Sequence, residues 1–310
     1  MAEKLAWRVR GLSEAAFRAA FGAEEQCRAV VAKLRWPRGF VCPSCGGCAG
    51  TRLKSRPLIQ CRGCRRQVSL TAGTIFHSTK LPLTTWFLAI WLIASAKNGI
   101  SSIELGRRLG IKQSHAWAMK QKIMQVMAER ENGKPLAGRI EMDDAYLGGE
   151  RRGKRGRGAA GKTPFVAAVS TSDDRRPRKL KLLPVRGFRK TEVTKLAARH
   201  LVPESRVVTD GLRCWQALAE AGIAHRAMIT GSGRQAARWS PFKWVNTTLG
   251  NIKSAITGTC RQISREHAHR YLASFAWRFN RRYQLDTILP RLVHSAARTA
   301  PLPYRALVAS

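Results

Sequence analysis

Four cysteines near the N-terminus constrain the fold of this 310-residue chain more than any other feature. Two residues separate Cys42 from Cys45 and Cys61 from Cys64, and fifteen residues lie between the pairs. Each C-x-x-C turn directs two thiolates at one ion, and four thiolates complete the tetrahedron that zinc prefers. A segment of about 35 residues buries too little core to fold alone, so metal binding would supply its folding energy. The spacing therefore predicts a structural zinc site.

Two alternatives stay open at this site. Iron occupies four-cysteine sites as well. Cys48 lies close enough in sequence to replace Cys45 as a ligand. The other cysteines, Cys27, Cys214 and Cys260, are expected to be small buried apolar residues.

The charge of the chain is strongly unbalanced. Lys and Arg total 56 against 19 Asp and Glu, which gives a net charge of +37. Such an excess implies a polyanionic partner, and nucleic acid is the first candidate because each neutralised phosphate releases counterions. An acidic membrane surface is the rival, but no basic amphipathic helix stands out as an anchor. We therefore expect double-stranded DNA as the partner, with no membrane and no small-molecule substrate.

The N-terminal residues carry charges where a signal peptide would be apolar. The most apolar run, residues 84–96, is too short to span a bilayer. Eight cysteines in such a chain favour a reducing compartment and metal ligation over disulfides. We expect a cytoplasmic, nucleoid-associated protein of bacterial type.

Hydropathy patterns divide the chain into segments. Helical spacing covers residues 1–40, the zinc ribbon residues 41–75, and a second helical region residues 83–130. After a linker, strand patterns alternate with helical ones over residues 139–290. This order predicts an α/β domain with a mixed sheet flanked by helices, followed by a C-terminal tail over residues 291–310.

The second helical region has the pattern of a helix-turn-helix. Ile103, Leu105 and Leu109 supply the apolar face of the first helix, and Gly110 takes the turn. The second helix would present polar residues to DNA. These are Gln113, Ser114, His115 and Lys120. A plain helical hairpin is the alternative.

A basic, glycine-rich stretch covers residues 150–163. We expect a loop that contacts phosphates through four residues, and the alternative is a solvated charge run. The four are Arg151, Arg152, Lys154 and Arg155.

Acidic residues at two predicted strands suggest a second metal site. Asp143 and Asp144 lie within or at the end of one strand, and Asp210 follows another. A carboxylate there is costly unless paired, and carboxylates on neighbouring strands suit a divalent metal. Two metals would activate a water or a 3′-hydroxyl and stabilise the leaving oxygen of a phosphodiester. The alternatives are local: Asp210 as a turn or capping residue, and Asp143 paired with an arginine.

The third ligand has two candidates. Glu266 is the plain expectation, an acid in the late helical region. Asn246 is the other, because an amide oxygen ligates a hard cation. Lys253, two helical turns after Asn246, would share its face and hold a phosphate.

Several segments together resemble the zinc-ribbon insertion-sequence transposases of the DDE superfamily. The ribbon LRWPRGFVCPSCGGC…CRGC is similar to their N-terminus, and IEMDDAYLGG to their D-E-x-Y-x-G-G strand. GKTPFVAAV, VVTDG, WVNTTLGNIK and HRYLASFAWRFNRR resemble later elements, so the likeness runs from about residue 15 to 283.

This resemblance implies an RNase H-like catalytic domain preceded by a zinc ribbon and a helix-turn-helix. It makes Asp143 and Asp210 the first two catalytic residues. WVNTTLGNIK resembles the branch with Asn in the third position, which favours Asn246 over Glu266 and gives Lys253 a base or phosphate contact. Asp144 stands where the family often has Glu, and its role is open. Structural Zn²⁺ and catalytic Mg²⁺, replaceable by Mn²⁺, would be the cofactors.

The implied activity is DNA cleavage and strand transfer at the ends of an insertion sequence, by a homo-oligomer that brings two ends together. A DNA-binding regulator without catalysis, or a decayed transposase copy, is the alternative. A structural RNA-binding protein ranks last, because the few aromatic residues lie in apolar patterns.

Overall fold

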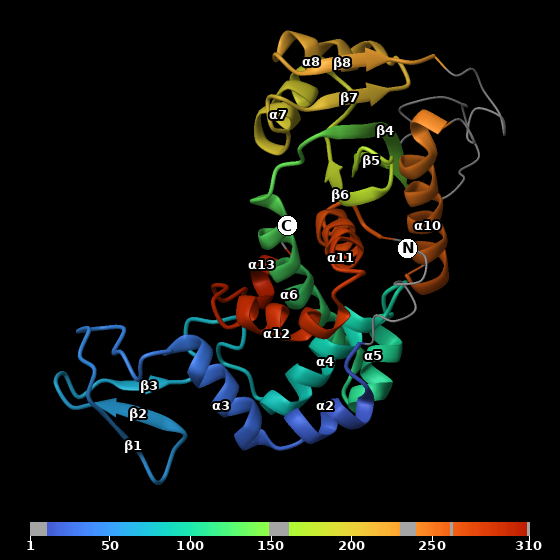
Figure 1. Cartoon of the computed structure of the whole chain (residues 1–310). Coiled ribbons are helices and arrows are strands. Elements are labelled where there is room, and N and C mark those ends of the chain that lie inside the picture. The colour runs from blue at the N-terminus through green and yellow to red at the C-terminus, as the bar shows by residue number, and fades with distance from the viewer. Residues whose placement is uncertain (1–10, 149–160, 230–239, 261–262, 309–310) are drawn as a thin grey trace. The chain divides into compact units, whose positions relative to one another are not determined.

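A computed structural model describes residues 11–148, 161–229, 240–260 and 263–308. The chain divides into two compact units, each described by itself (Figure 1). The first combines Met1–Ala96, Ser102–Val126 and Tyr283–Ser310, and the second combines Lys97–Ser101 and Met127–Arg282.

The first unit is mainly helical. Its helices are α2 (Glu14–Phe21), α3 (Glu24–Arg35), α4 (Leu83–Ser95), α5 (Ser102–Leu109), most of α6 (Gln113–Asn132), α12 (Leu285–Ala296) and α13 (Tyr304–Val308). Ser13 caps α2 by accepting a hydrogen bond from the amide of Ala16. The apolar helix α4 packs against α3 and α12. The segment predicted as a C-terminal tail thus contributes helices to this unit, and the predicted boundary at residue 290 falls inside α12.

The predicted zinc ribbon contains a small antiparallel sheet of β1 (Gly50–Arg52), β2 (Leu58–Cys61) and β3 (Gln67–Ser69). Its buried cluster consists of Cys42, Cys61 and Val68, with Trp36 and Phe40 packed against it. Two of the three buried residues are predicted zinc ligands, so the apolar core of this sheet is very small.

The second unit is built on a five-stranded sheet. Its strands are β4 (Arg139–Leu147), β5 (Thr163–Thr171), β6 (Pro177–Pro184), β7 (Arg206–Thr209) and β8 (Ala224–Ala227). Their order is β6-β5-β4-β7-β8. The first three pair antiparallel, whereas β7 pairs parallel with both β4 and β8. The predicted mixed sheet is confirmed, and it is that of an RNase H-like domain.

Helices cover both faces of this sheet. Ile140 and Met142 of β4 face α7 (Lys190–His200), the 3-10 helix η1 (Arg213–Trp215) and α8 (Gln216–Glu220). Ala145 and Leu147 face the opposite layer, formed by η2 (Ser240–Phe242), α10 (Lys243–Thr259) and α11 (Ala268–Asn280). Alternate residues of β4 therefore belong to different cores, as the pleat of a strand requires.

A buried polar network ties α11 to the sheet. Glu131 at the end of α6 accepts hydrogen bonds from Arg281 at 2.6 Å and from Asn280 at 2.7 Å. Asn280 also bonds both backbone groups of Leu180 on β6. The negative charge of Glu131 is thus paired, as a buried carboxylate requires.

Within the described ranges, no helix combines the length and apolar character needed to cross a membrane. The 13-residue helix α4 is instead part of a protein core.

Candidate functional site

The four predicted zinc ligands lie together. The Sγ atoms of Cys42 and Cys64 are 3.6 Å apart, and those of Cys45 and Cys61 are 3.5 Å apart. All four sulfur atoms lie within 4.8 Å of one another. The thiol of Cys48 lies outside this group and faces the carbonyl of Gly46. The donor set is therefore four thiolates with Cys45 among them, which suits structural zinc.

Two equivalent backbone turns hold these cysteines. The amide of Gly46 donates to the carbonyl of Cys42, and the amide of Arg65 donates to that of Cys61. Gly46 has a φ of 71° and Arg65 a φ of 61°, so each turn closes on a left-handed residue. Local sequence thus sets the geometry of each ligand pair.

The same turns favour the thiolate form of Cys42 and Cys61, one cysteine of each pair. Hydrogen bonds from the amides of Cys45 and Ser44 lower the pKa of Cys42 to about 6. A hydrogen bond from the amide of Cys64 likewise lowers the pKa of Cys61. The amide of Gly47 lowers the pKa of Cys45, but side-chain hydrogen bonds with the other three thiols outweigh it and raise that pKa to about 11. Since the thiolate is the form that binds metal, the fold favours the metal-binding form at Cys42 and Cys61, and Cys45 would lose its proton when the metal binds.

A second cluster lies in the sheet of the other unit. Strand β7 pairs with β4 up to Val208 opposite Glu141, so Asp210 follows β7 at the level of Asp143. The carboxylates of Asp143, Asp144 and Asp210 lie within 4.8 Å of one another. Asp143 lies inside β4 and not at its end, because β4 continues beside β5 to Leu147. The predicted approach of acids from neighbouring strands is confirmed.

Hydrogen bonds from nearby backbone and side-chain groups orient two of these carboxylates. Asp210 Oδ1 accepts from the amide of Leu212 at 3.2 Å and from the indole Nε1 of Trp215 at 3.0 Å. Asp143 Oδ1 accepts from the amide of Asp144 at 2.9 Å. Trp215 is fully buried, so its ring provides a rigid donor beside Asp210.

Three half-buried carboxylates this close repel one another unless a cation lies among them. Oxygen donors of this kind suit hard divalent ions such as Mg²⁺ and Mn²⁺. The residues present therefore fit a divalent metal site.

The candidates for the third position lie on different elements. Asn246 is in the first turn of α10 and half-buried, and Lys253 is exposed on the same helix. Glu266 lies in the turn before α11, is exposed and is outside the acid cluster. Glu266 thus lies apart from the acid cluster, and the preference for Asn246 as the third ligand stays a prediction.

Glu141, a fully buried carboxylate two residues before Asp143 on β4, was not predicted from the sequence. Its carboxylate contacts the start of α10. A signal was present, because an acid inside an apolar strand requires a partner.

The predicted helix-turn-helix corresponds to α5 and α6. Gly110 has a φ of 64°, the left-handed conformation that its turn requires. Leu105 is fully buried, whereas Ile103 is 55% exposed, so its predicted place in the apolar face is wrong. Two residues along a helix rotate the side chain by about 200°, which directs Ile103 away from the face of Leu105.

Three of the four polar residues predicted on α6 are exposed, namely Gln113, Ser114 and His115. Lys120 is only 4% exposed, so its predicted exposure is wrong. It shares a helix face with the buried Ala116 and Met124, each four residues away. A lysine in that stripe is not available to a phosphate in this conformation.

The basic residues Arg151, Arg152, Lys154 and Arg155 lie outside the described residues.

Both clusters lie in segments that match models of known protein families. Residues 22–67 match the model of a transposase zinc-ribbon domain, and residues 135–280 match that of an ISXO2-like transposase domain. The first match contains the cysteine cluster and the second contains the acid cluster. The chain is also similar to an uncharacterized protein in transposable element ISH50 of Halobacterium salinarum. The two are 26% identical over 220 residues, covering 64% of this chain and 71% of the relative.

Proposed function

Because two segments of this chain match the zinc-ribbon and catalytic-domain models of insertion-sequence transposases, we propose that it binds the ends of an insertion sequence and catalyses their cleavage and strand transfer. The observation that carries the proposal is the cluster of Asp143, Asp144 and Asp210 within 4.8 Å. Three carboxylates gathered on two neighbouring strands supply the oxygen donors that a hard divalent cation prefers.

In this proposal Asp143, Asp210 and Asn246 hold Mg²⁺ at the scissile phosphate. Bound there, the metal would activate a water or a 3′-hydroxyl and stabilise the leaving oxygen. Trp215 keeps the carboxylate of Asp210 oriented toward the centre. Lys253, exposed two turns beyond Asn246, contacts a phosphate of the bound strand.

DNA recognition belongs to the other parts of the chain. The exposed start of α6, with Gln113, Ser114 and His115, faces bases. The zinc ribbon and the basic residues 151–155 contact the phosphate backbone. Two copies of the chain join the two ends of the element, since strand transfer requires both ends.

A cleavage assay tests the proposal. The purified full chain is given Mg²⁺ and a duplex carrying the DNA that flanks its own gene. We expect nicks at the element ends, lost by a factor on the order of 10³ in Asp143→Ala, because a metal supplies several kcal/mol of transition-state stabilisation. DNA binding should be retained in that variant. Retained cleavage by Asp143→Ala would refute the assignment.

The same assay tests the main alternative. Tight, salt-sensitive binding without nicks under Mg²⁺ or Mn²⁺ would favour a regulator or a decayed copy. A regulator has no need of the clustered acids, so their presence favours the enzyme.

A further inference from the structure

Glu141 is a carboxylate that the proposed chemistry does not use. Its side chain is 1% exposed and lies on β4 two residues before Asp143. Residues two apart on a strand share a face, so both belong to the face of the sheet that α10 and α11 cover. An ionised carboxylate buried there is costly unless charge and hydrogen bonds compensate it.

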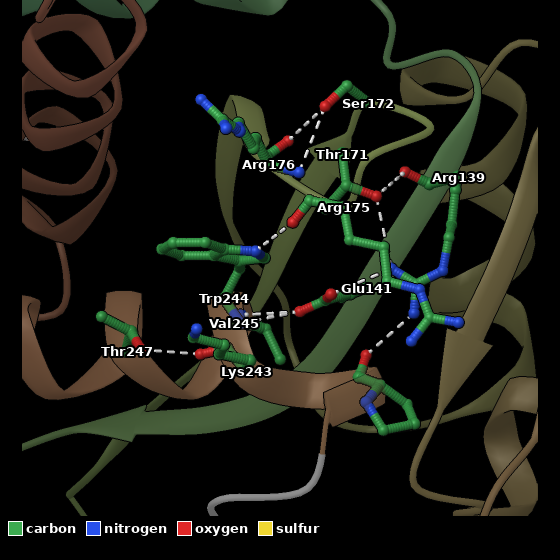
Figure 2. Close-up of polar contacts among 11 residues, drawn as sticks. Arg139, Glu141, Thr171, Ser172, Arg175, Arg176, Lys243, Trp244, Val245 and Thr247 are labelled. Atoms are coloured by element: carbon green, nitrogen blue, oxygen red, sulfur yellow. Dashed lines mark hydrogen bonds and ion pairs between the residues drawn. The ribbon is translucent and has the colours of Figure 1, made fainter. Parts of the chain in front are cut away.

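The partners of Glu141 come from the start of α10 (Figure 2). Its Oε2 accepts hydrogen bonds from the amides of Trp244 at 2.9 Å and Val245 at 3.1 Å. These are the second and third residues of α10, and its N-cap Phe242 provides no side-chain acceptor. Glu141 thus caps the helix from a neighbouring strand, and its charge lies at the positive end of the helix dipole.

Arg139 pairs with Glu141 and also bonds the residue before Phe242, the N-cap of α10. Its guanidinium donates to Glu141 Oε1 at 2.9 Å and to the carbonyl of Pro241 at 3.2 Å. The indole of Trp244 bonds the carbonyl of Arg175 in the turn between β5 and β6. Figure 2 shows these bonds joining the first turn of α10 to the sheet at several points.

The residue after Val245 is Asn246, the proposed third ligand, and β4 carries Asp143. We propose that Glu141 is a positioning residue that sets the first turn of α10 against β4 and thereby presents Asn246 to the metal. This inference rests on the proposed function. A cap that only stabilised the helix would not affect metal binding beyond its effect on folding.

The test replaces Glu141 with Gln. One amide group has an oxygen and a nitrogen, so it directs a donor either at Arg139 or at the backbone amides. We expect Mn²⁺ binding to weaken about tenfold, as for other residues that orient metal ligands. The probe is Mn²⁺ alone, added to the zinc-loaded full chain without DNA, with free Mn²⁺ measured by electron paramagnetic resonance.

Glu131→Gln is the matched control. Glu131 is the other buried carboxylate described for this unit, with partners Arg281 and Asn280 on a different element. Its replacement should lower the melting temperature much as Glu141→Gln does, while leaving Mn²⁺ affinity unchanged.

Asn246→Ala and the double variant Glu141→Gln/Asn246→Ala complete a cycle. If Glu141 acts through Asn246, the double variant binds Mn²⁺ no more weakly than Asn246→Ala alone.

Four outcomes would overturn the inference: wild-type affinity in Glu141→Gln, an equal loss in Glu131→Gln, additive losses in the cycle, or no loss in Asn246→Ala. The wild-type nicking assay keeps the two proposals apart. A chain that binds Mn²⁺ with this pattern but does not nick DNA would retain the positioning role and lose the proposed function.

Discussion

The two metal sites of this chain relate to folding in opposite ways. In the zinc ribbon, two of the three buried residues of the cluster, Cys42 and Cys61, are predicted zinc ligands. Val68 is the one buried residue of the cluster that is not a predicted ligand. In the second unit, the acids lie on a sheet with an apolar core on each face. We therefore expect the ribbon to need its metal in order to fold, and the second unit to fold first and then offer a metal site.

Zinc removal should have the largest effect, and it should affect the ribbon alone. Zinc binding contributes on the order of 10 kcal/mol to folding in comparable small domains. We expect a chelator to expose the amides of β1, β2 and β3 to hydrogen exchange, while β4 to β8 stay protected. Hydrogen exchange with mass spectrometry, before and after zinc release, measures both regions in one experiment.

Cysteine variants supply the control for this prediction. Cys45→Ser should release zinc and unfold the ribbon, because Cys45 belongs to the four-sulfur group. Cys48→Ser should leave both unchanged, because Cys48 lies outside it. A ribbon that keeps its protected amides without zinc would show that its core suffices.

The acid cluster should depend instead on its protein neighbours. In Trp215→Phe, Asp210 loses the indole hydrogen bond of 3.0 Å. We expect the dissociation constant of Mn²⁺ to rise about tenfold, since groups that orient a ligand have effects of this size. The hydrogen-exchange protection of the sheet should change little, because the phenyl ring retains most of the packing.

Trp277→Phe is the matched control, a second buried tryptophan of the same unit. Its Nε1 has no hydrogen-bond partner among the described residues, so the change removes no hydrogen bond and affects only packing and the cation–π contact with Arg281. Equal losses of Mn²⁺ affinity in the two variants would contradict an orienting role for Trp215.

The smallest effect concerns the backbone of the ribbon. Gly46 has a φ of 71°, and a Cβ there would meet no atom within 4 Å. Gly46→Ala should therefore weaken zinc binding by about 1 kcal/mol through conformational strain alone. Competition with a zinc chelator measures the change. Gly63→Ala should cost less, because Gly63 lacks a positive φ and its Cβ would make only ordinary contacts at 3.9 Å.

The zinc site was predictable because its ligands lie close together in the sequence. Each pair of cysteines lies in one short turn, so spacing alone indicates four ligands for one ion. The order of strands and helices in the second unit was likewise predictable from hydropathy patterns, as was the left-handed turn at Gly110. The acids Asp143 and Asp210 were recognisable because charge on a buried strand is costly.

Side-chain surroundings were less accessible to sequence reasoning. Lys120 looked exposed as a charged residue near the start of a helix, yet it shares the buried face of Ala116. Ile103 looked buried as an apolar residue, yet it lies on the open side of α5. In both cases the packing of helices decided the outcome, and residue type did not.

Sequence patterns alone predicted a four-thiolate site, a mixed α/β domain and acids on two neighbouring strands. Local spacing and the period of apolar residues carry that information. Two further features depend on how the chain folds: Asp144 joins Asp143 and Asp210, and Glu141 caps α10. Those contacts join residues far apart in the chain, and pairing of this kind depends on strand register and helix packing that no local pattern encodes.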